Sequence, residues 1–195
     1  MQVEYTALIQ NRTWSLVPHS RGANVVTGKW LFHHKFKADG SLECYKARWV
    51  VRGFSQRPGV DFGETFSSVV KAATIHTVLS VAATRQWPVH QMDVNSAFLH
   101  RHLTEHVYCQ QPVGFIDANN PDHVCLLDQS LYDLKQGPRA WFARFATFIR
   151  TTGFHDSRSD PSLFTLHHDD GAAYLLLYVD DIILAASSLT LLQRL

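Results

Sequence analysis

The alternation of apolar and polar positions predicts a β hairpin in the first quarter of the chain. The β signal runs over residues 25–51, and from Trp30 to Lys37 ring-bearing side chains alternate with a largely basic set. The dipeptide Asp39-Gly40 is typical of a hairpin turn, and a second β run follows over residues 42–51. Side chains two positions apart in a strand share a face, so Lys46 and Arg48 are expected side by side, about 7 Å apart.

Two segments have the spacing of amphipathic helices. Apolar residues at 75, 78, 79 and 82 predict a helix over residues 72–86, which Pro88 would end. A second helix is predicted from Pro138, in its first turn, to a capping Gly153. Its apolar stripe is interpreted as core packing and consists of Trp141, Phe142, Phe145, Phe148 and Ile149.

The remaining segments give shorter signals. Residues 11–24 are expected to form an irregular, partly docked arm, and residues 104–137 to be irregular or β. A short strand over residues 89–93 should precede a short helix over 96–103. Residues 167–171 are expected to form an exposed turn between two strands.

The last strong pattern places two carboxylates between two apolar runs. Residues 174–179 and 182–186 flank Asp180 and Asp181, which predicts two buried strands joined by a tight turn. Adjacent carboxylates at such a place are costly unless a cation offsets them, although an ordinary solvated turn is the alternative. Asp93 ends the short strand, and three carboxylates on two strand ends could hold two Mg²⁺ ions for an in-line phosphoryl displacement.

Composition and charge refine this picture. A chain of 195 residues with 46% hydrophobic and 18% charged residues is typical of one globular domain and excludes a disordered tail or a disulfide scaffold. The net charge of +1 conceals an asymmetry, because residues 21–57 carry eight Lys/Arg and two Asp/Glu, whereas residues 71–195 carry nine and twelve. Phosphate is therefore expected to meet the basic part and cations the acidic part.

The cysteines and the apolar runs bear on location. Cys44, Cys109 and Cys125 lack metal-binding spacing and are interpreted as reduced thiols of an intracellular protein. No secretory signal opens the sequence. The longest apolar run, residues 172–179, has eight residues, far fewer than the ~20 that span a bilayer. We expect no membrane partner and a cytoplasmic (particle-associated) or nuclear protein that is not secreted.

Short motifs in a fixed order over residues 11–186 resemble the copia-type branch of LTR-retrotransposon polyproteins. The segment 178–181, Tyr-Val-Asp-Asp, resembles the Y-x-D-D box of reverse transcriptases. The other motifs are Gly28-Lys29-Trp30, Asp39-Gly40-Ser41, Tyr45-Lys46-Ala47-Arg48, Gly53-Phe54-Ser55-Gln56, Glu64-Thr65-Phe66-Ser67, His90-Gln91-Met92-Asp93-Val94, Leu134-Lys135-Gln136 and Pro138-Arg139-Ala140-Trp141.

The resemblance implies an α+β fold of the right-hand polymerase type, as a single reverse transcriptase domain over residues 1–195. The palm, a small antiparallel sheet backed by helices, would occupy about residues 71–103 and 141–195. The basic, β-rich fingers would occupy about residues 1–70 and 104–140. The thumb and RNase H segments are expected to belong to a longer polyprotein.

The resemblance also implies RNA-directed DNA synthesis, in which a primer 3′-hydroxyl attacks the α-phosphate of a dNTP on an RNA or DNA template. Two Mg²⁺ ions, which Mn²⁺ could replace, would be held by Asp93, Asp180, Asp181 and the backbone carbonyl of Val94. The residues implied to bind the dNTP are Lys46, Arg48, Phe98 and Gln136. Those implied to lie beside the primer are Tyr178 and Val179.

The sequence departs from the family pattern at Asp133, where the family has glycine. A glycine with positive φ would be costly to replace, although Asp is among the better tolerated substitutes. Asp133 and the expected lack of a thumb favour an alternative, a catalytically inactive retroelement remnant that at most binds nucleic acid. The three aspartates favour the polymerase. A two-metal nuclease is a third hypothesis, against which the Lys46/Arg48 strand argues.

Overall fold

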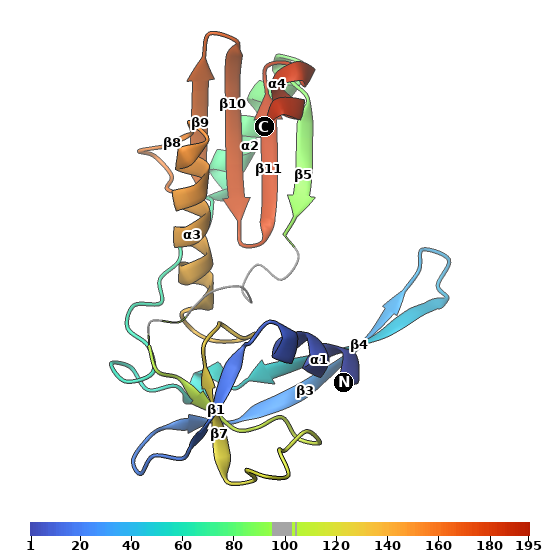
Figure 1. Cartoon of the computed structure of the whole chain (residues 1–195). Helices are drawn as coiled ribbons and strands as arrows, with labels where there is room; N and C mark the ends of the chain where they lie inside the picture. The colour runs from blue at the N-terminus through green and yellow to red at the C-terminus, as the bar shows by residue number, and fades with distance from the viewer. Residues whose placement is uncertain (95–102, 104) are drawn as a thin grey trace. The chain divides into compact units, whose positions relative to one another are not determined.

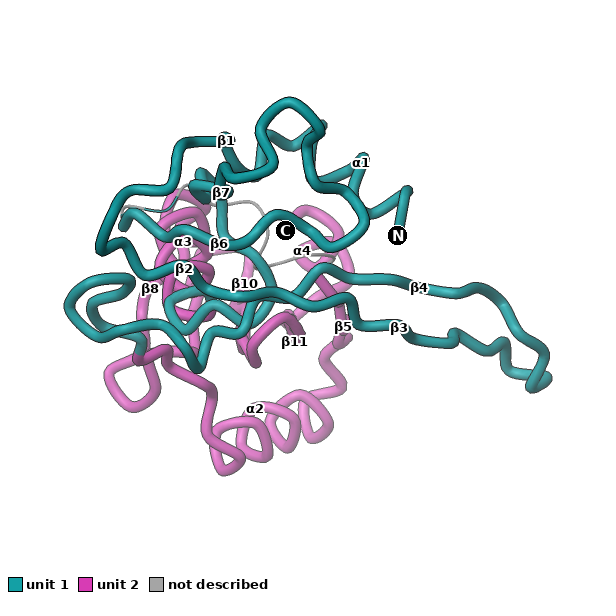
Figure 2. The backbone as a smooth tube through the Cα atoms, turned by 90° about the horizontal axis from the view of Figure 1, so that it is seen from below, with its two compact units in different colours: residues 1–65, 98–137 teal, residues 66–97, 138–195 magenta. Residues whose placement is uncertain are grey.

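The computed structural model describes residues 1–94, 103 and 105–195. The chain forms two compact units, which we call unit 1 (residues 1–65 and 98–137) and unit 2 (residues 66–97 and 138–195) (Figure 2). No helix of the described part is both long and apolar enough to cross a membrane.

Unit 1 contains a helix and a small mixed sheet. Helix α1 covers Gln2–Gln10, and the sheet has the strand order β1-β7-β6-β2, in which β2 and β6 run parallel and the other pairs antiparallel. The strands are β1 (Trp14–Pro18), β2 (Val25–Val26), β6 (Tyr108–Cys109) and β7 (His123–Leu127). The prediction of an irregular arm over residues 11–24 is therefore wrong for residues 14–18, which pair with β7 along their whole length.

The predicted hairpin of unit 1 is confirmed. Strands β3 (Gly28–Phe36) and β4 (Leu42–Val51) form a two-stranded antiparallel ribbon that extends away from the rest of the unit (Figures 1 and 2). Asp39 shapes the turn by accepting hydrogen bonds from the backbone N–H and the hydroxyl of Ser41. The inner end of the ribbon supplies the fully buried Trp49 and Val51 to the core of the unit.

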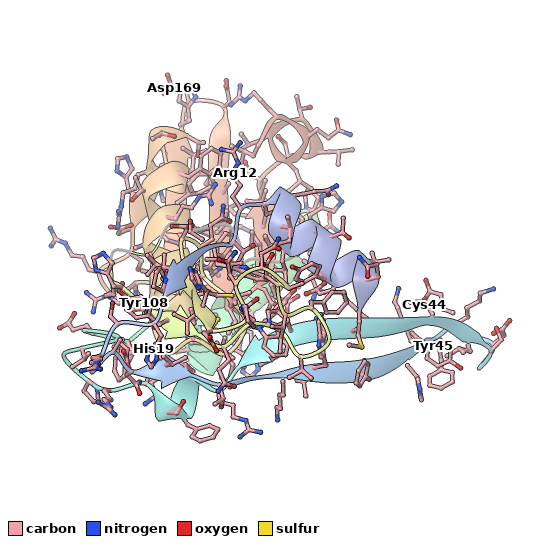
Figure 3. All side chains as sticks on the ribbon, turned by 60° about the horizontal axis from the view of Figure 1, so that its bottom comes forward. Arg12, His19, Cys44, Tyr45, Tyr108 and Asp169 are labelled. Atoms are coloured by element: carbon pink, nitrogen blue, oxygen red, sulfur yellow. The ribbon has the colours of Figure 1, made fainter. Side chains whose placement is uncertain are left out.

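The outer part of the ribbon is exposed on both faces. Cys44 and Tyr45 lie there with their side chains on opposite faces (Figure 3). A short 3₁₀ helix, η1 (Gly53–Ser55), follows β4. The other two cysteines, Cys109 and Cys125, are buried directly opposite each other in β6 and β7. The hydrogen bond that the Cys109 thiol donates to Cys125 and the burial of the thiol both raise the pKa of Cys109.

Unit 2 is a five-stranded antiparallel sheet with the strand order β5-β11-β10-β9-β8. Its strands are β5 (Val89–Asp93), β8 (His155–Asp156), β9 (Leu163–His168), β10 (Gly171–Tyr178) and β11 (Asp181–Ala186). Its helices are α2 (Ala72–Thr84), α3 (Gly137–Thr151, of which the first residue belongs to unit 1) and α4 (Leu189–Arg194). The predicted strand over residues 89–93 and the predicted helices over 72–86 and from Pro138 are confirmed.

Both faces of the sheet are covered, which explains the unbroken apolar run in β10. Leu175 and Leu177 belong to a core cluster with residues of α3 and α4, whereas Leu176, which points to the other face, packs with Val78 and Ala82 of α2. A strand buried on both faces needs apolar residues at consecutive positions. The central strands β10 and β11 are therefore held between two helical layers.

The expected apolar stripe of α3 is correct in part. Phe145 and Ile149 are buried against the sheet, and Trp141 and Phe142 are partly buried beside them. Phe148 is 61% exposed, because the buried face is centred on Phe145, Ala146 and Ile149 and Phe148 lies outside it. Gly153 (φ 94°) ends the helix, as predicted.

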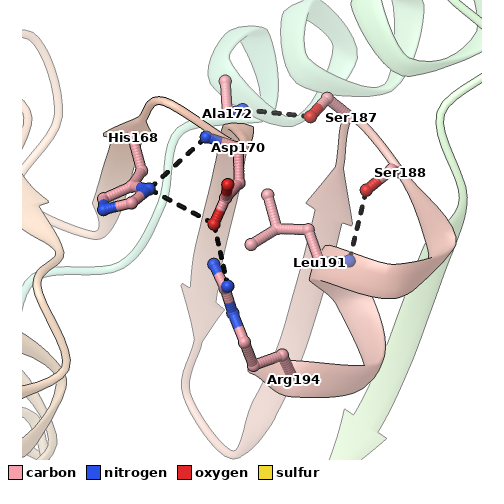
Figure 4. Close-up of polar contacts among 7 residues, drawn as sticks. All are labelled: His168, Asp170, Ala172, Ser187, Ser188, Leu191 and Arg194. Atoms are coloured by element: carbon pink, nitrogen blue, oxygen red, sulfur yellow. Dashed lines mark hydrogen bonds and ion pairs between the residues drawn. The ribbon is translucent and has the colours of Figure 1, made fainter.

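The turn between β9 and β10 fastens the last helix to the sheet (Figure 4). Asp170, in this exposed turn, pairs with Arg194 of α4 at 2.9 Å and with His168 at 3.4 Å. Arg194 and His168 hold the pKa of the Asp170 carboxyl below its usual range. The hydroxyl of Ser188 caps α4 by accepting a hydrogen bond from the backbone N–H of Leu191.

Candidate active site

The predicted tight turn between the two apolar strands is confirmed and has an unusual backbone. Tyr178 of β10 and Asp181 of β11 are paired, so Val179 and Asp180 alone form the turn. Val179 has φ of 59°, whereas Asp180 does not adopt a positive φ. This combination is that of a type II′ turn, in which the first central residue is usually glycine. A β-branched residue there is strained, at a cost of about 1–3 kcal/mol.

The third aspartate meets this turn through strand pairing. Strand β5 runs antiparallel to β11, and Asp93 lies directly opposite Asp181. Opposed residues of antiparallel strands share a face, with Cβ atoms about 4.5–5.5 Å apart. The backbone N–H of Val94 donates a 3.0 Å hydrogen bond to the carbonyl oxygen of Asp180. Asp93 is thus brought to the same end of the sheet as Asp180 and Asp181, which are distant from it in the chain.

The aspartates can receive a cation from the solvent side. Asp93 is exposed, and Asp180 and Asp181 are half-buried. The side chain of Gln91 donates a 3.3 Å hydrogen bond to the Oδ1 atom of Asp181. Carboxylate and carbonyl oxygens are the ligands that Mg²⁺ prefers, so the donor chemistry fits.

The described residues contain no group of three or more His, Cys, Asp and Glu side chains gathered closely enough to hold a metal by themselves. Mg²⁺ is commonly bound by one or two carboxylates together with waters and substrate phosphates. The arrangement therefore suits an ion that arrives with a phosphate ligand, and the metal-binding roles of Asp93, Val94, Asp180 and Asp181 stay predictions.

Residues around the turn add a contact that sequence reasoning missed. Tyr178 and Val179 are 48% and 36% exposed, as an approach by another molecule requires. The indole N–H of Trp141 donates a 2.7 Å hydrogen bond to the carbonyl oxygen of Val179. The apolar spacing of the helix predicts only core packing for Trp141, whereas its place in the motif Pro138-Arg139-Ala140-Trp141 was a signal for a further role.

The predicted phosphate-binding pair lies in unit 1. Lys46 and Arg48 share the face of β4 opposite that of Trp49; Lys46 is exposed and Arg48 half-buried. The Arg48 guanidinium lies 5.2 Å from the ring centroid of Tyr132, which restricts its orientation. Burial raises the pKa of the Glu4 carboxyl, and the charges of Arg48 and Lys46 oppose this shift, which places a carboxyl near the pair.

Of the other two predicted nucleotide contacts, Gln136 and Phe98, only Gln136 lies among the described residues. Gln136 is 4% exposed, accepts a 3.0 Å hydrogen bond from the side chain of Gln56 and donates one of 3.1 Å to the carbonyl oxygen of Asp61. It would have to break these bonds to reach a nucleotide, so the geometry favours a structural role. Phe98 lies outside the described residues.

The unusual Asp133 adopts the conformation that a glycine would favour. Its φ is 73°, in the left-handed region, which Asp tolerates better than most residues. A β-carbon on Gly53 would overlap the carbonyl oxygen of Asp133, so glycine is required at position 53. Asp133 thus has a backbone conformation that glycine would adopt without strain.

Comparisons with known proteins agree with the motifs. A family profile described as reverse transcriptase (RNA-dependent DNA polymerase) matches residues 11–195. The retrovirus-related Pol polyproteins from transposons RE2 and RE1 of Arabidopsis thaliana are each 48% identical over the whole chain, which spans 13% of either relative. The corresponding polyprotein from transposon TNT 1-94 of Nicotiana tabacum is 42% identical, and the chain spans 15% of it. The chain therefore belongs to the reverse transcriptase family, among the Pol polyproteins of copia-type retrotransposons.

Proposed function

We propose that this chain is the fingers and palm portion of a copia-type Pol polyprotein and catalyses RNA-directed DNA synthesis. The reaction joins a dNTP to a primer 3′-hydroxyl: the 3′-oxygen bonds to the α-phosphorus, and diphosphate leaves. The pairing of Asp93 with Asp181 beside the Val179–Asp180 turn carries the proposal. The chain spans 13% of its first Arabidopsis relative, so the rest of the polyprotein would supply further parts of the enzyme.

The proposed roles follow from the chemistry of the side chains. Asp93, Asp180 and Asp181, with the carbonyl of Val94, would hold two Mg²⁺ ions, which when bound lower the pKa of the primer hydroxyl and neutralise charge on the phosphates. Lys46 and Arg48 would bind the triphosphate, since guanidinium makes bidentate and ammonium single contacts with phosphate oxygens.

Four further residues would shape the site. Tyr178 and Val179 are partly exposed at the turn and would contact the primer terminus. Phe98 would pack against the sugar of the dNTP, and its ring would exclude a 2′-hydroxyl. Gln136 would support the site through its buried hydrogen bonds.

We infer that unit 1 is the fingers and unit 2 the palm. Unit 2 has a small antiparallel sheet covered by helices and contains all three aspartates, which supports its assignment as the palm. Unit 1 has the exposed ribbon that carries Lys46 and Arg48, which supports its assignment as the fingers.

Primer extension on poly(rA)/oligo(dT) with Mg²⁺ or Mn²⁺ tests the proposal. The chain should incorporate dTTP, and Asp180→Asn should reduce the rate by at least about 100-fold, because metal ions contribute several kcal/mol and 1.36 kcal/mol is tenfold in rate. Asp169→Asn, in the exposed turn at the other end of β10, is the matched control and should keep the full rate. Absence of incorporation at high protein concentration would support the inactive remnant, and strand cleavage without dNTP would support a nuclease.

A further inference from the structure

We propose that Trp141 is a positioning residue that fixes the central peptide of the Val179–Asp180 turn and thereby orients Asp180 for metal binding. The inference concerns the aspartates described above and rests on the proposed function. Three observations carry it: the strained backbone of Val179, the hydrogen bond from the indole of Trp141, and a second tether on Asp180 itself.

Two turn types have a positive φ at the first central residue of a two-residue hairpin, and Val179-Asp180 is the typical sequence of neither. A type II′ turn has positive φ at its first central residue, and a type I′ turn at both. The two differ chiefly in the orientation of the peptide plane between the central residues. Glycine or asparagine normally stabilises such turns, and a β-branched residue such as Val179 is disfavoured at positive φ. An external contact is therefore needed to select one orientation.

Trp141 supplies that contact at the atom that decides the orientation. Its indole N–H lies 2.7 Å from the carbonyl oxygen of Val179, which belongs to the central peptide. This separation is at the short limit for an N–H···O hydrogen bond. A flip of the peptide would turn the carbonyl away from the indole and lose the bond. The flip would also reorient the backbone N–H of Asp180, which belongs to the same peptide, and would thereby change the backbone conformation of Asp180.

The anchor on the other side of the hydrogen bond is rigid. Trp141 lies on α3, and its ring packs against that of Phe145 with centroids 5.5 Å apart. Phe145 is 8% exposed in the core that joins α3 to the sheet. The position of the indole is therefore fixed by the fold, not by the turn that it contacts.

Asp180 is consequently restrained on both sides. The peptide before it is fixed by Trp141 through Val179, and its own carbonyl accepts the 3.0 Å hydrogen bond from the N–H of Val94. Val94 directly follows Asp93, so the second tether ties the turn to the strand that supplies the partner carboxylate. A carboxylate with a fixed backbone loses less conformational freedom when it binds a cation.

The substitution Trp141→Phe tests the inference, because phenylalanine keeps an aromatic ring on Phe145 and removes only the N–H donor. Trp30→Phe is the matched control, since the indole of Trp30 donates a similar 2.9 Å hydrogen bond to a backbone carbonyl, that of Val113. Each variant loses one hydrogen bond of the same kind. Only Trp141→Phe should affect the turn.

Spectroscopic, binding and kinetic measurements separate positioning from stability. In the unsubstituted chain the indole proton of Trp141 should exchange slowly with solvent, and in Trp141→Phe the amide resonance of Asp180 should shift or broaden. Mn²⁺ affinity and kcat for primer extension should fall about 3- to 10-fold, the equivalent of one ordinary hydrogen bond. The KM for dNTP should stay the same, and Trp30→Phe should leave the Asp180 resonance and Mn²⁺ affinity unchanged.

The outcomes keep this inference separate from the proposed function. A rapidly exchanging indole proton, or an Asp180 resonance unchanged in Trp141→Phe, would overturn the positioning role even if the chain extends primers. Equal losses of Mn²⁺ affinity in the two tryptophan variants would overturn it as well. Failure of the unsubstituted chain to bind Mn²⁺ and to extend a primer would reject the proposed function, whereas the resonance still reports on the turn.

Discussion

Replacing Asp160 by asparagine should lower the free energy of unfolding, because this carboxylate organises the start of α2. Asp160 is 1% exposed. One of its oxygens accepts hydrogen bonds from the backbone N–H of Lys71 (2.9 Å) and the hydroxyl of Thr74 (2.7 Å), and the other accepts from the N–H of Ser162 (3.0 Å). Lys71 is the N-cap of α2 and has no capping side-chain hydrogen bond of its own, so Asp160 takes that role from a distant loop.

The magnitude follows from these bonds. Asparagine has one acceptor oxygen, so its NH₂ group must face at least one N–H or O–H that now meets a carboxylate oxygen. Losing one hydrogen bond to a charged group costs about 1.5–3 kcal/mol. Losing the negative charge at a helix N-terminus costs about 0.3–1 kcal/mol more. We therefore expect Asp160→Asn to lower the free energy of unfolding by about 2–4 kcal/mol, out of the roughly 5–15 kcal/mol typical of domains.

The effect should also depend on pH with a definite sign. Burial disfavours the charged form of Asp160, but the hydrogen bonds from Lys71, Thr74 and Ser162 outweigh it and hold the pKa of the carboxyl below its usual range. A carboxyl with a depressed folded-state pKa stabilises the protein above its unfolded-state pKa, about 3.9. This contribution is lost as the pH falls through the folded-state pKa.

Urea titrations of the native chain, Asp160→Asn and the exposed control Asp169→Asn measure both effects. Asp160→Asn should be the less stable at pH 7, and the difference should shrink as the pH falls below 4. A free energy of unfolding within about 0.5 kcal/mol of the native value, the range of ordinary surface substitutions, would refute the capping role. A difference that grows on acidification would refute the assigned direction of the pKa shift.

Further predictions concern the predicted phosphate-binding pair, Lys46 and Arg48, and the close approach of Gly53 to Asp133. Lys46→Ala and Arg48→Ala should each raise the KM for dNTP more than the dissociation constant for template–primer; unchanged dNTP affinity in both variants, measured by steady-state kinetics, would remove the pair from the triphosphate site. Asp133→Gly should raise the free energy of unfolding by up to about 1 kcal/mol, because glycine adopts φ of 73° without strain, and a marked loss in a urea titration would contradict this reading. Gly53→Ala should destabilise the chain in the same titration, since its β-carbon would overlap the carbonyl oxygen of Asp133; native stability would show that this loop can move.

Local chemistry made several elements predictable from the sequence. The ribbon was recognisable because Asp39-Gly40 favours a tight turn, and the buried β10–β11 hairpin because sheets covered on both faces require consecutive apolar residues. The helices α2 and α3 were recognisable from their apolar spacing and from Pro138 and Gly153 at the ends of α3.

Long-range pairing limited the prediction elsewhere. The strand Trp14–Pro18 has too short an alternation to identify alone, and it is fixed by β7, more than a hundred positions away. The opposition of Cys109 and Cys125 likewise depends on strand register, not on their spacing. Such contacts arise in the folded chain and leave no local signal.

The aspartate site was likewise predictable in part from the sequence and in part dependent on long-range pairing. The motifs identified the acidic residues, but spacing alone could not show that Asp93 lies directly opposite Asp181. The strain at Val179 and the hydrogen bond from Trp141 are properties of the folded turn. The burial of Gln136 depends on a partner, Gln56, that lies 80 positions away.

The most direct test of the account is the binding of Mn²⁺, followed by electron paramagnetic resonance, to the native chain and to single aspartate variants. If Asp93 and Asp181 hold a shared ion, Asp93→Asn and Asp181→Asn should each lower Mn²⁺ affinity by at least about tenfold, or 1.4 kcal/mol. Asp169→Asn should bind Mn²⁺ as the native chain does. Equal affinity in all four proteins would contradict the claim that these opposed carboxylates form a metal site.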